Sequence, residues 1–359
     1  MSSTSPEQMS PPNPEKMSRT NWEKLSRTTP ENSKLVICVG VPFNLWRPPQ
    51  EFSLAVKRRF PQMRVVHLPD YSGLEAELPD TDIFVGYSIR PKQFAFANRL
   101  MWIHSTAAGI AQLLYPELRE SGIIVTNASG VHSIPIAEHV LGLVLSLARR
   151  FPDAFRYQRE SKWAQQEIWD ATPQPQELRG AVLLLIGLGA IGKEVARVGR
   201  AIGMKTRAVT LSGHGDGTLV EKIYPVANLD AALAESDFVV LAAPETPETH
   251  HLMNASRFAA MKPSGYFINV ARGSLVDEPA LIEALEQQRI AGAALDVAEI
   301  EPLPPESPLW NCPNLFITPH LAGASEHLWE RQTDLLIDNL ERWFEGRELR
   351  NLVDLKRGY

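Results

Sequence analysis

Three polar side chains in the second half of the chain stand where apolar runs end. They are Arg272, Glu301 and His320. Because the carboxyl ends of parallel strands meet at one edge of a sheet, we expect these side chains to lie together beside a ligand. An imidazole can protonate the alkoxide that hydride reduction of a ketone leaves, and a carboxylate can fix the imidazole tautomer and favour its protonated form. A guanidinium can clamp a substrate carboxylate through two parallel hydrogen bonds and polarise the adjacent carbonyl.

This combination predicts a hydride-transfer site with His320 as proton donor, Glu301 as its orienting partner and Arg272 as the carboxylate clamp. Taken alone, each residue has an ordinary structural interpretation as a surface ion-pair residue, a loop residue or a cap. A glycine motif upstream of all three favours the chemical interpretation.

The glycine motif is Gly-Leu-Gly-Ala-Ile-Gly, and it follows a run of apolar residues and opens a segment of helical periodicity. In this context Gly187 permits a tight turn, Gly189 lets the backbone approach a pyrophosphate, and Gly192 lets helix and strand pack closely. The N–H groups and positive dipole end of the helix would bind the phosphates. The predicted dinucleotide-binding positions are Gly187, Gly189, Ala190, Ile191 and Gly192.

The residue expected near the adenosine ribose is Thr210. Dinucleotide sites of this type commonly carry an acid about 20 residues after the motif, but no acid occurs from 195 to 215. A hydroxyl tolerates a 2′-phosphate that a carboxylate would repel, although no Arg directly follows Thr210. Arg207 and His214 are the nearest basic candidates. An NAD(P)H cofactor is therefore predicted, with NADP modestly favoured over NAD.

From residue 34 onward, short β-branched runs alternate with helical patterns, which is typical of βα units in parallel sheets. The predicted strands are 35–39, 65–67, 83–85, 102–104 and 123–125 in a first series, then 181–186, 205–210, 238–242, 266–270, 291–297 and 315–318. The predicted helices are 51–60, 91–97, 133–150 and 325–344, and 151–180 is predicted to be an irregular arm. The fold class is therefore α/β, with two doubly wound parallel-sheet domains.

The segment 133–150 carries apolar residues around most of its circumference, which implies burial on several sides, between domains or between subunits. These residues are Ile136, Val140, Leu141, Val144, Leu145 and Leu147. Residues 1–33 are rich in Ser, Pro, Thr, Glu and Lys and are predicted to be a disordered extension.

Composition excludes several classes of protein. The formal charge of −6, from 36 basic and 42 acidic residues, argues against nucleic-acid or membrane-surface partners. The longest apolar stretch, 140–148, is far shorter than the roughly 20 residues that span a bilayer. The two cysteines, Cys38 and Cys312, suit a reducing compartment, so a cytoplasmic location is expected.

Several histidines could in principle bind a ligand. His250 and His251 are adjacent, and we expect their side chains to point in different directions, so no metal site is predicted. His132 and His139 are interpreted as structural, and His104 stands at a strand end near the predicted pocket.

The motifs together resemble one family. Residues 187–192, Asn-Val-Ala-Arg-Gly-Ser-Leu-Val-Asp at 269–277, Ala-Leu-Asp-Val at 294–297 with Glu301-Pro302, and Thr-Pro-His at 318–320 resemble the D-isomer-specific 2-hydroxyacid dehydrogenases. The similarity extends from about residue 34 to the C-terminus. It implies the roles already argued for the Arg, the Glu and the His, a small 2-keto or D-2-hydroxy acid as substrate, and a homodimer.

The resemblance also implies further site residues and a domain layout. The loop for the substrate carboxylate corresponds to Ala108 and Gly109, Asp296 lies near the nicotinamide amide, and Pro244 belongs to the cofactor site. Tyr87 occupies a pocket position where many members carry Arg, which disfavours a phosphorylated substrate and suggests a glyoxylate or hydroxypyruvate reductase. A Rossmann-type cofactor domain, 131–320, would be inserted into a flavodoxin-like substrate domain made of 34–130 and 321–359.

Two alternatives remain open. One is a non-catalytic NAD(H)-dependent binding protein on the same scaffold, similar to a corepressor. The other, an amino acid dehydrogenase, is disfavoured because no Lys belongs to the constellation.

Overall fold

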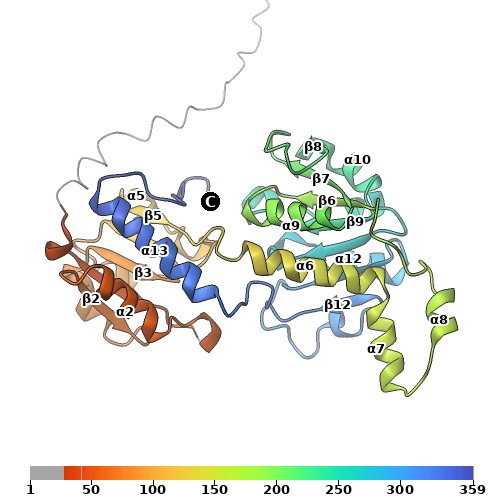
Figure 1. Ribbon diagram of the computed structural model, residues 1–359, viewed down its shortest axis with the longest axis horizontal. Coiled ribbons are helices and arrows are strands. Elements are labelled where there is room, and N and C mark those ends of the chain that lie inside the picture. Colours follow the sequence, from red (N-terminus) through yellow and green to blue (C-terminus); the bar gives the residue numbers. More distant parts are fainter. Residues whose placement is uncertain (1–27, 42, 359) are drawn as a thin grey trace, which may run out of the picture.

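The computed structural model describes residues 28–41 and 43–358, which form two parallel sheets with their covering helices (Figure 1). Predictions that fall on 1–27 lie outside the described residues. The short helix η2, Pro30–Asn32, lies inside the segment for which disorder was predicted. The carbonyl oxygen of the buried Ser33 accepts a hydrogen bond from Arg64 N, which attaches this segment to the sheet edge.

The smaller domain is built on a five-stranded parallel sheet with the order β2-β1-β3-β4-β5. Its strands are β1 (Lys34–Cys38), β2 (Arg64–Leu68), β3 (Ile83–Gly86), β4 (Trp102–Ser105) and β5 (Ile124–Thr126), and its helices include α2 (Gln50–Arg59), α3 (Leu74–Glu77), α4 (Pro91–Phe94) and α5 (Pro116–Glu120). This is the strand order of flavodoxin-like folds, as the sequence predicted.

The helix α13, Leu328–Phe344, returns from the end of the chain to this smaller domain and lies against α2 (Figure 1). Leu336, Leu340 and Trp343 are completely buried in its core. The Trp343 ring stacks on Trp102 of β4 with 5.3 Å between centroids. The smaller domain is therefore closed by a segment that follows the whole of the larger domain in sequence.

The larger domain is built on a seven-stranded parallel sheet with the order β12-β11-β10-β9-β6-β7-β8. Its strands are β6 (Val182–Ile186), β7 (Lys205–Thr210), β8 (Lys222–Pro225), β9 (Phe238–Leu241), β10 (Tyr266–Asn269), β11 (Gly292–Leu295) and β12 (Leu315–Ile317), and its helices include α9 (Ala190–Ala201), α10 (Leu229–Ala234), α11 (Ala255–Ala260) and α12 (Glu278–Glu286). The order reverses between β6 and β9, the position where ligands bind in doubly wound sheets. The predicted fold class is confirmed. β8 was not predicted, because this short edge strand ends in Pro and has one buried residue.

The helix α6, Ser133–Ala148, begins between the two domains and runs along the larger one (Figure 1). It packs against α9 and contributes to the core on one face of the larger sheet. Ile136, Val140, Val144 and Leu147 are buried as predicted, whereas Leu145 is exposed.

The segment predicted to be an irregular arm contains two helices, α7 (Phe151–Arg159) and α8 (Gln165–Asp170). Asp153 pairs with Arg150 at 2.7 Å and with Arg156 at 3.2 Å, both at helical spacing, and Pro152 fits the first turn. The prediction of an irregular arm is therefore wrong for 151–159 and 165–170.

Short 3-10 helices complete the chain: η3 (Asn44–Trp46), η4 (Leu78–Asp80), η5 (Ala111–Leu113), η6 (Val226–Asn228), η7 (Pro247–Thr249), η8 (Gly273–Leu275) and η9 (Pro308–Asn311). Within the described ranges, every helix is too short or too polar to cross a bilayer.

Candidate active site

The glycine motif forms the turn between β6 and α9. Gly187 has φ +103°, and a Cβ there would lie 2.6 Å from the carbonyl oxygen of Ala242. A Cβ on Gly192 would collide with the carbonyl oxygen of Gly187, so helix and strand pack as closely as backbone allows. A Cβ on Gly189 would meet no atom within 4 Å. Open space therefore lies beside the helix start, where the N–H groups of Ala190 and Ile191 lack intrahelical acceptors, and this cradle fits a pyrophosphate.

The carboxyl end of β7 carries Thr210, as predicted. Its hydroxyl donates to the carbonyl oxygen of His214 at 3.0 Å, which closes the loop that follows the strand. Arg207 is not free for a phosphate, because its guanidinium pairs with Glu235. The ammonium of Lys193 lies nearer this loop, 3.9 Å from Asp216.

Arg272 follows β10 at the carboxyl edge of the larger sheet. The completely buried Asn269 accepts a hydrogen bond from Ala271 N at 2.9 Å and donates one to Arg272 O at 2.9 Å. The Arg272 guanidinium donates to Ala271 O at 2.6 Å. A buried amide thus shapes the turn that presents the guanidinium, a role for Asn269 that sequence reasoning missed.

The predicted carboxylate loop of the smaller domain meets this guanidinium. A Cβ on Gly109 would lie 2.6 Å from Arg272 Nη2. The loop is held by Asn127, whose amide donates to Ala108 O at 2.7 Å. Among the described residues, no acceptor is paired with the backbone N–H of Ala108 or Gly109. Two unpaired N–H groups and a guanidinium are therefore close together, a combination that suits a carboxylate.

His320 and Glu301 form a hydrogen-bonded pair. His320 Nδ1 lies 2.6 Å from Glu301 Oε2, and the other Glu301 oxygen accepts from Ala298 N at 3.1 Å. Burial raises the pKa of Glu301, but the hydrogen bond and charge of His320 outweigh burial and hold that pKa below its usual value. The carboxylate therefore stays ionised, fixes the imidazole through Nδ1 and leaves Nε2 for a substrate.

Asp296 holds the loop that carries His320. Its buried carboxylate accepts from Thr318 Oγ1 at 2.6 Å, Leu321 N at 2.9 Å and Ala322 N at 3.0 Å. Its carbonyl oxygen accepts a hydrogen bond from His320 N at 2.8 Å, and His320 has φ +51°. Asp296, expected near a nicotinamide amide, thus has a structural role that the sequence did not show.

His132, interpreted as structural, belongs to the surroundings of the site. Its Nδ1 lies 3.2 Å from the carbonyl oxygen of Gly323. Burial lowers the pKa of His132, and the charges of Arg331, Arg272 and His320 lower it further. A His at the start of α6 carried no signal of this proximity in the sequence.

The remaining predicted residues occupy different environments. Tyr87 follows β3, is 40% exposed, and its carbonyl oxygen accepts from Gln112 Nε2 at 2.7 Å. The loop after β9 contains Pro244, whose carbonyl oxygen accepts Thr249 Oγ1 at 2.8 Å. His104 is completely buried, with Nδ1 2.8 Å from Thr126 Oγ1, and it offers no surface to a substrate.

The chain is similar to one family of known proteins. Residues 141–322 match the family model described as D-isomer specific 2-hydroxyacid dehydrogenase, NAD binding domain. A glyoxylate reductase from Thermofilum pendens is 36% identical over 251 residues, which cover 70% of this chain and 74% of the relative. The chain belongs to this family.

Solved structures of related dehydrogenases and reductases are similar to both domains of this chain. A D-isomer specific 2-hydroxyacid dehydrogenase from Xanthobacter autotrophicus, in complex with NADPH and MES, is 31% identical with a TM-score of 0.78 and covers 91% of this chain and 100% of its own. An NADPH-dependent glyoxylate/hydroxypyruvate reductase from Sinorhizobium meliloti, in complex with NADP and sulfate, is 28% identical with a TM-score of 0.77 and covers the same shares. The similarity therefore includes the smaller domain, which the family model does not match.

Proposed function

We propose that the protein catalyses hydride transfer between a nicotinamide dinucleotide and a small 2-keto acid, with a D-2-hydroxy acid as the reduced product. One observation carries the proposal. The guanidinium of Arg272 touches the backbone of Gly109 in the other domain, and the His320–Glu301 pair follows neighbouring strands of the same sheet. Clamp, acid and orienting carboxylate thus come from separate segments.

Binding of the substrate carboxylate involves both domains. Arg272 forms charge-assisted hydrogen bonds to it, and the N–H groups of Ala108 and Gly109 donate from the opposite side. The same guanidinium polarises the adjacent carbonyl and stabilises negative charge on its oxygen. The position of the carbonyl is therefore set before proton transfer.

Proton transfer is the task of His320. Its protonated Nε2 donates a proton to the carbonyl oxygen in reduction, and its unprotonated Nε2 accepts the hydroxyl proton in oxidation, while Glu301 holds the ring through Nδ1. When bound, a nicotinamide dinucleotide would be held at the turn of Gly187, Gly189 and Gly192 at the start of α9, and it would supply or accept the hydride.

The proposed substrate class is glyoxylate or hydroxypyruvate. The reductases from Thermofilum pendens and Sinorhizobium meliloti are named for these acids. Tyr87 supports a small, unphosphorylated substrate, because it supplies no cation at its position after β3.

The proposed cofactor is NADPH in preference to NADH. Thr210 supplies a hydroxyl where a carboxylate would repel a 2′-phosphate, and Lys193 lies near the same loop. The two solved relatives bind NADPH or NADP.

The proposed assembly is a homodimer in the cytoplasm. The family resemblance suggests the dimer, and large apolar side chains are exposed along the α6–α8 segment: Ile134, Leu145, Phe151, Phe155, Trp163 and Trp169. We also propose that 34–130 with 321–359 form the substrate domain and 131–320 the dinucleotide domain.

The test is steady-state oxidation of NADH and NADPH with glyoxylate, hydroxypyruvate and pyruvate, for the wild type and His320→Gln. The wild type should turn over at least one acid, faster with NADPH. The substitution should lower kcat by about 10²- to 10⁴-fold with nearly unchanged cofactor affinity. Tight cofactor binding without turnover of any acid would instead support the non-catalytic binding protein.

A further inference from the structure

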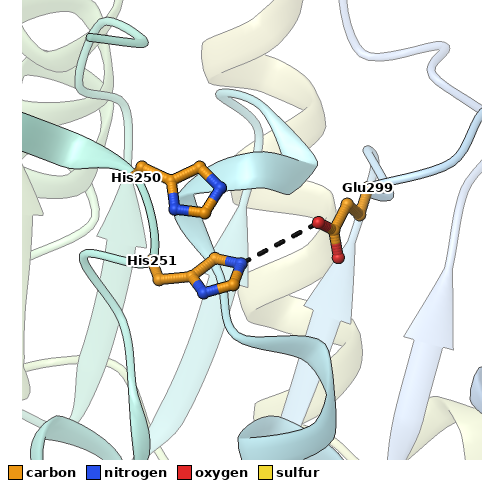
Figure 2. A group of neighbouring side chains, drawn as sticks. All are labelled: His250, His251 and Glu299. Carbon is orange, nitrogen blue, oxygen red and sulfur yellow. Dashed lines mark ion pairs between the residues drawn. The ribbon is translucent and has the colours of Figure 1, made fainter. Parts of the chain in front are cut away.

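Two imidazoles and a carboxylate converge at the carboxyl edge of the larger sheet, apart from the catalytic residues (Figure 2). His250 and His251 lie in the loop between β9 and α11, and Glu299 lies in the loop after β11. One ligand atom from each residue lies within 4.8 Å of the other two. His251 Nε2 lies 3.9 Å from Glu299 Oε1.

The side chains of the two adjacent histidines were expected to point in different directions, but they lie side by side. His251 has φ +48°, a left-handed conformation that turns its side chain to the side of its neighbour. The two rings stack with 4.0 Å between centroids and 26° between planes, and both extend toward Glu299 (Figure 2). The expectation of different directions is therefore wrong.

The loop that holds the histidines is fixed by its backbone. His251 N donates to Ser274 O at 2.9 Å, and Leu252 N donates to Thr249 O at 3.0 Å. The buried His251 Nε2 has no hydrogen-bond partner in the described structure. The backbone of this loop is therefore fixed, and the Nε2 atom of His251 takes part in no hydrogen bond.

The charge around the cluster favours a cation. Glu299 N donates to Glu278 Oε1 at 2.7 Å, so a second carboxyl group lies next to Glu299. A bound cation would be attracted by both carboxyl groups.

We propose that His250, His251 and Glu299 bind a divalent transition-metal ion, with Zn²⁺ the leading candidate. Two imidazoles and one carboxylate suit Zn²⁺, Co²⁺ and Ni²⁺ better than Mg²⁺ or Ca²⁺, which prefer all-oxygen sites. Tetrahedral ligands around zinc lie about 3.4 Å apart, given metal–ligand distances near 2.1 Å. Small side-chain rotations close the observed 3.9 Å.

Such an ion connects two loops that follow strands of the larger sheet. One loop follows β9, and the other leads directly from Glu299 to Glu301, the partner of His320. Three protein ligands leave the remaining position to water, which is consistent with partly exposed side chains. The ion would hold the loop after β9 and the loop after β11 together.

The test uses the full chain without an affinity tag, titrated with ZnCl₂ and separately with NiCl₂ in a calorimeter. One ion per chain should bind with a dissociation constant in the micromolar range or below. His251→Gln should weaken binding by roughly a hundredfold or more, and Glu299→Gln and His250→Gln by roughly tenfold or more each.

His327→Gln is the matched control, because His327 is an exposed histidine whose Nδ1 lies 3.0 Å from Glu330. It should leave Zn²⁺ affinity unchanged. No heat of binding at millimolar Zn²⁺ would overturn the proposal, as would wild-type affinity in folded His251→Gln.

Thermal unfolding gives a second readout, because an ion that binds the native state raises Tm. Zn²⁺ should raise the Tm of the wild type and His327→Gln by several degrees, reversibly on addition of EDTA, but not that of Glu299→Gln. An equal rise in Glu299→Gln would place the ion elsewhere and overturn the proposal.

Discussion

Gly109 and Arg272 are in contact across the two domains: a Cβ on Gly109 would lie 2.6 Å from Arg272 Nη2. The absence of a side chain at Gly109 therefore determines how closely the clamp approaches the carboxylate loop. In the proposed mechanism, both groups contact the same substrate carboxylate. This contact can be changed without touching the proton donor.

Gly109→Ala should fold, because the atom that it meets is the end of a flexible side chain, but it should displace the guanidinium. We expect the KM for the keto acid to rise about tenfold or more, with a smaller change in cofactor KM. Steady-state kinetics measure both constants. Gly142→Ala is the control, because its Cβ would meet nothing within 4 Å. An unchanged keto-acid KM in Gly109→Ala would contradict the assigned contact.

Asp296→Asn should loosen the loop that carries His320. An amide cannot accept hydrogen bonds at its nitrogen, so buried donors such as Ala322 N lose their partner, at a cost of roughly 2–3 kcal/mol. We expect a lower free energy of unfolding in denaturant titration and a kcat at least tenfold lower. Thr318→Ala removes one donor and should show a smaller effect on both. Lost cofactor affinity with unchanged stability would assign Asp296 to the cofactor alone.

Thr210→Asp should reverse the proposed cofactor preference. The new carboxylate would repel a 2′-phosphate and accept hydrogen bonds from an unmodified ribose. We expect kcat/KM with NADPH to fall at least tenfold while kcat/KM with NADH is retained or rises. Thr210→Ala removes only the hydrogen bond to His214 O and serves as the comparison. Equal losses with both cofactors would show that Thr210 does not discriminate between them.

His104 should make the fold sensitive to acid. Burial lowers its pKa from 6.5 to about 4 in the folded protein. Between these values the unfolded chain binds more protons than the folded chain, so stability falls as pH falls from 6.5 toward 4. The full loss from this residue is on the order of 3 kcal/mol. Denaturant titrations at several pH values should show a shallower loss in His104→Gln than in the wild type. Parallel curves would contradict the assignment.

Local patterns predicted most of the sheet framework and the ends of its strands. The alternation of apolar runs and helical periods, together with the glycine motif, depends on neighbours in sequence. For that reason the sequence located Arg272, Glu301 and His320 at one sheet edge. It missed α7 and α8, and in α7 the residues at helical spacing include the charge pairs of Arg150, Asp153 and Arg156.

The sequence by itself determined the fold class, the dinucleotide turn and which residue types reach the sheet edge, because each follows from short-range periodicity and backbone sterics. Only the tertiary structure decided that Gly109 meets Arg272, that Asp296 holds the His320 loop, and that the adjacent His250 and His251 stack toward Glu299. These contacts join segments far apart in the chain or depend on one left-handed residue. These contacts depend on the packing of two domains and on the dihedral angles of single loop residues. Neither produces a periodic pattern of residues in the sequence.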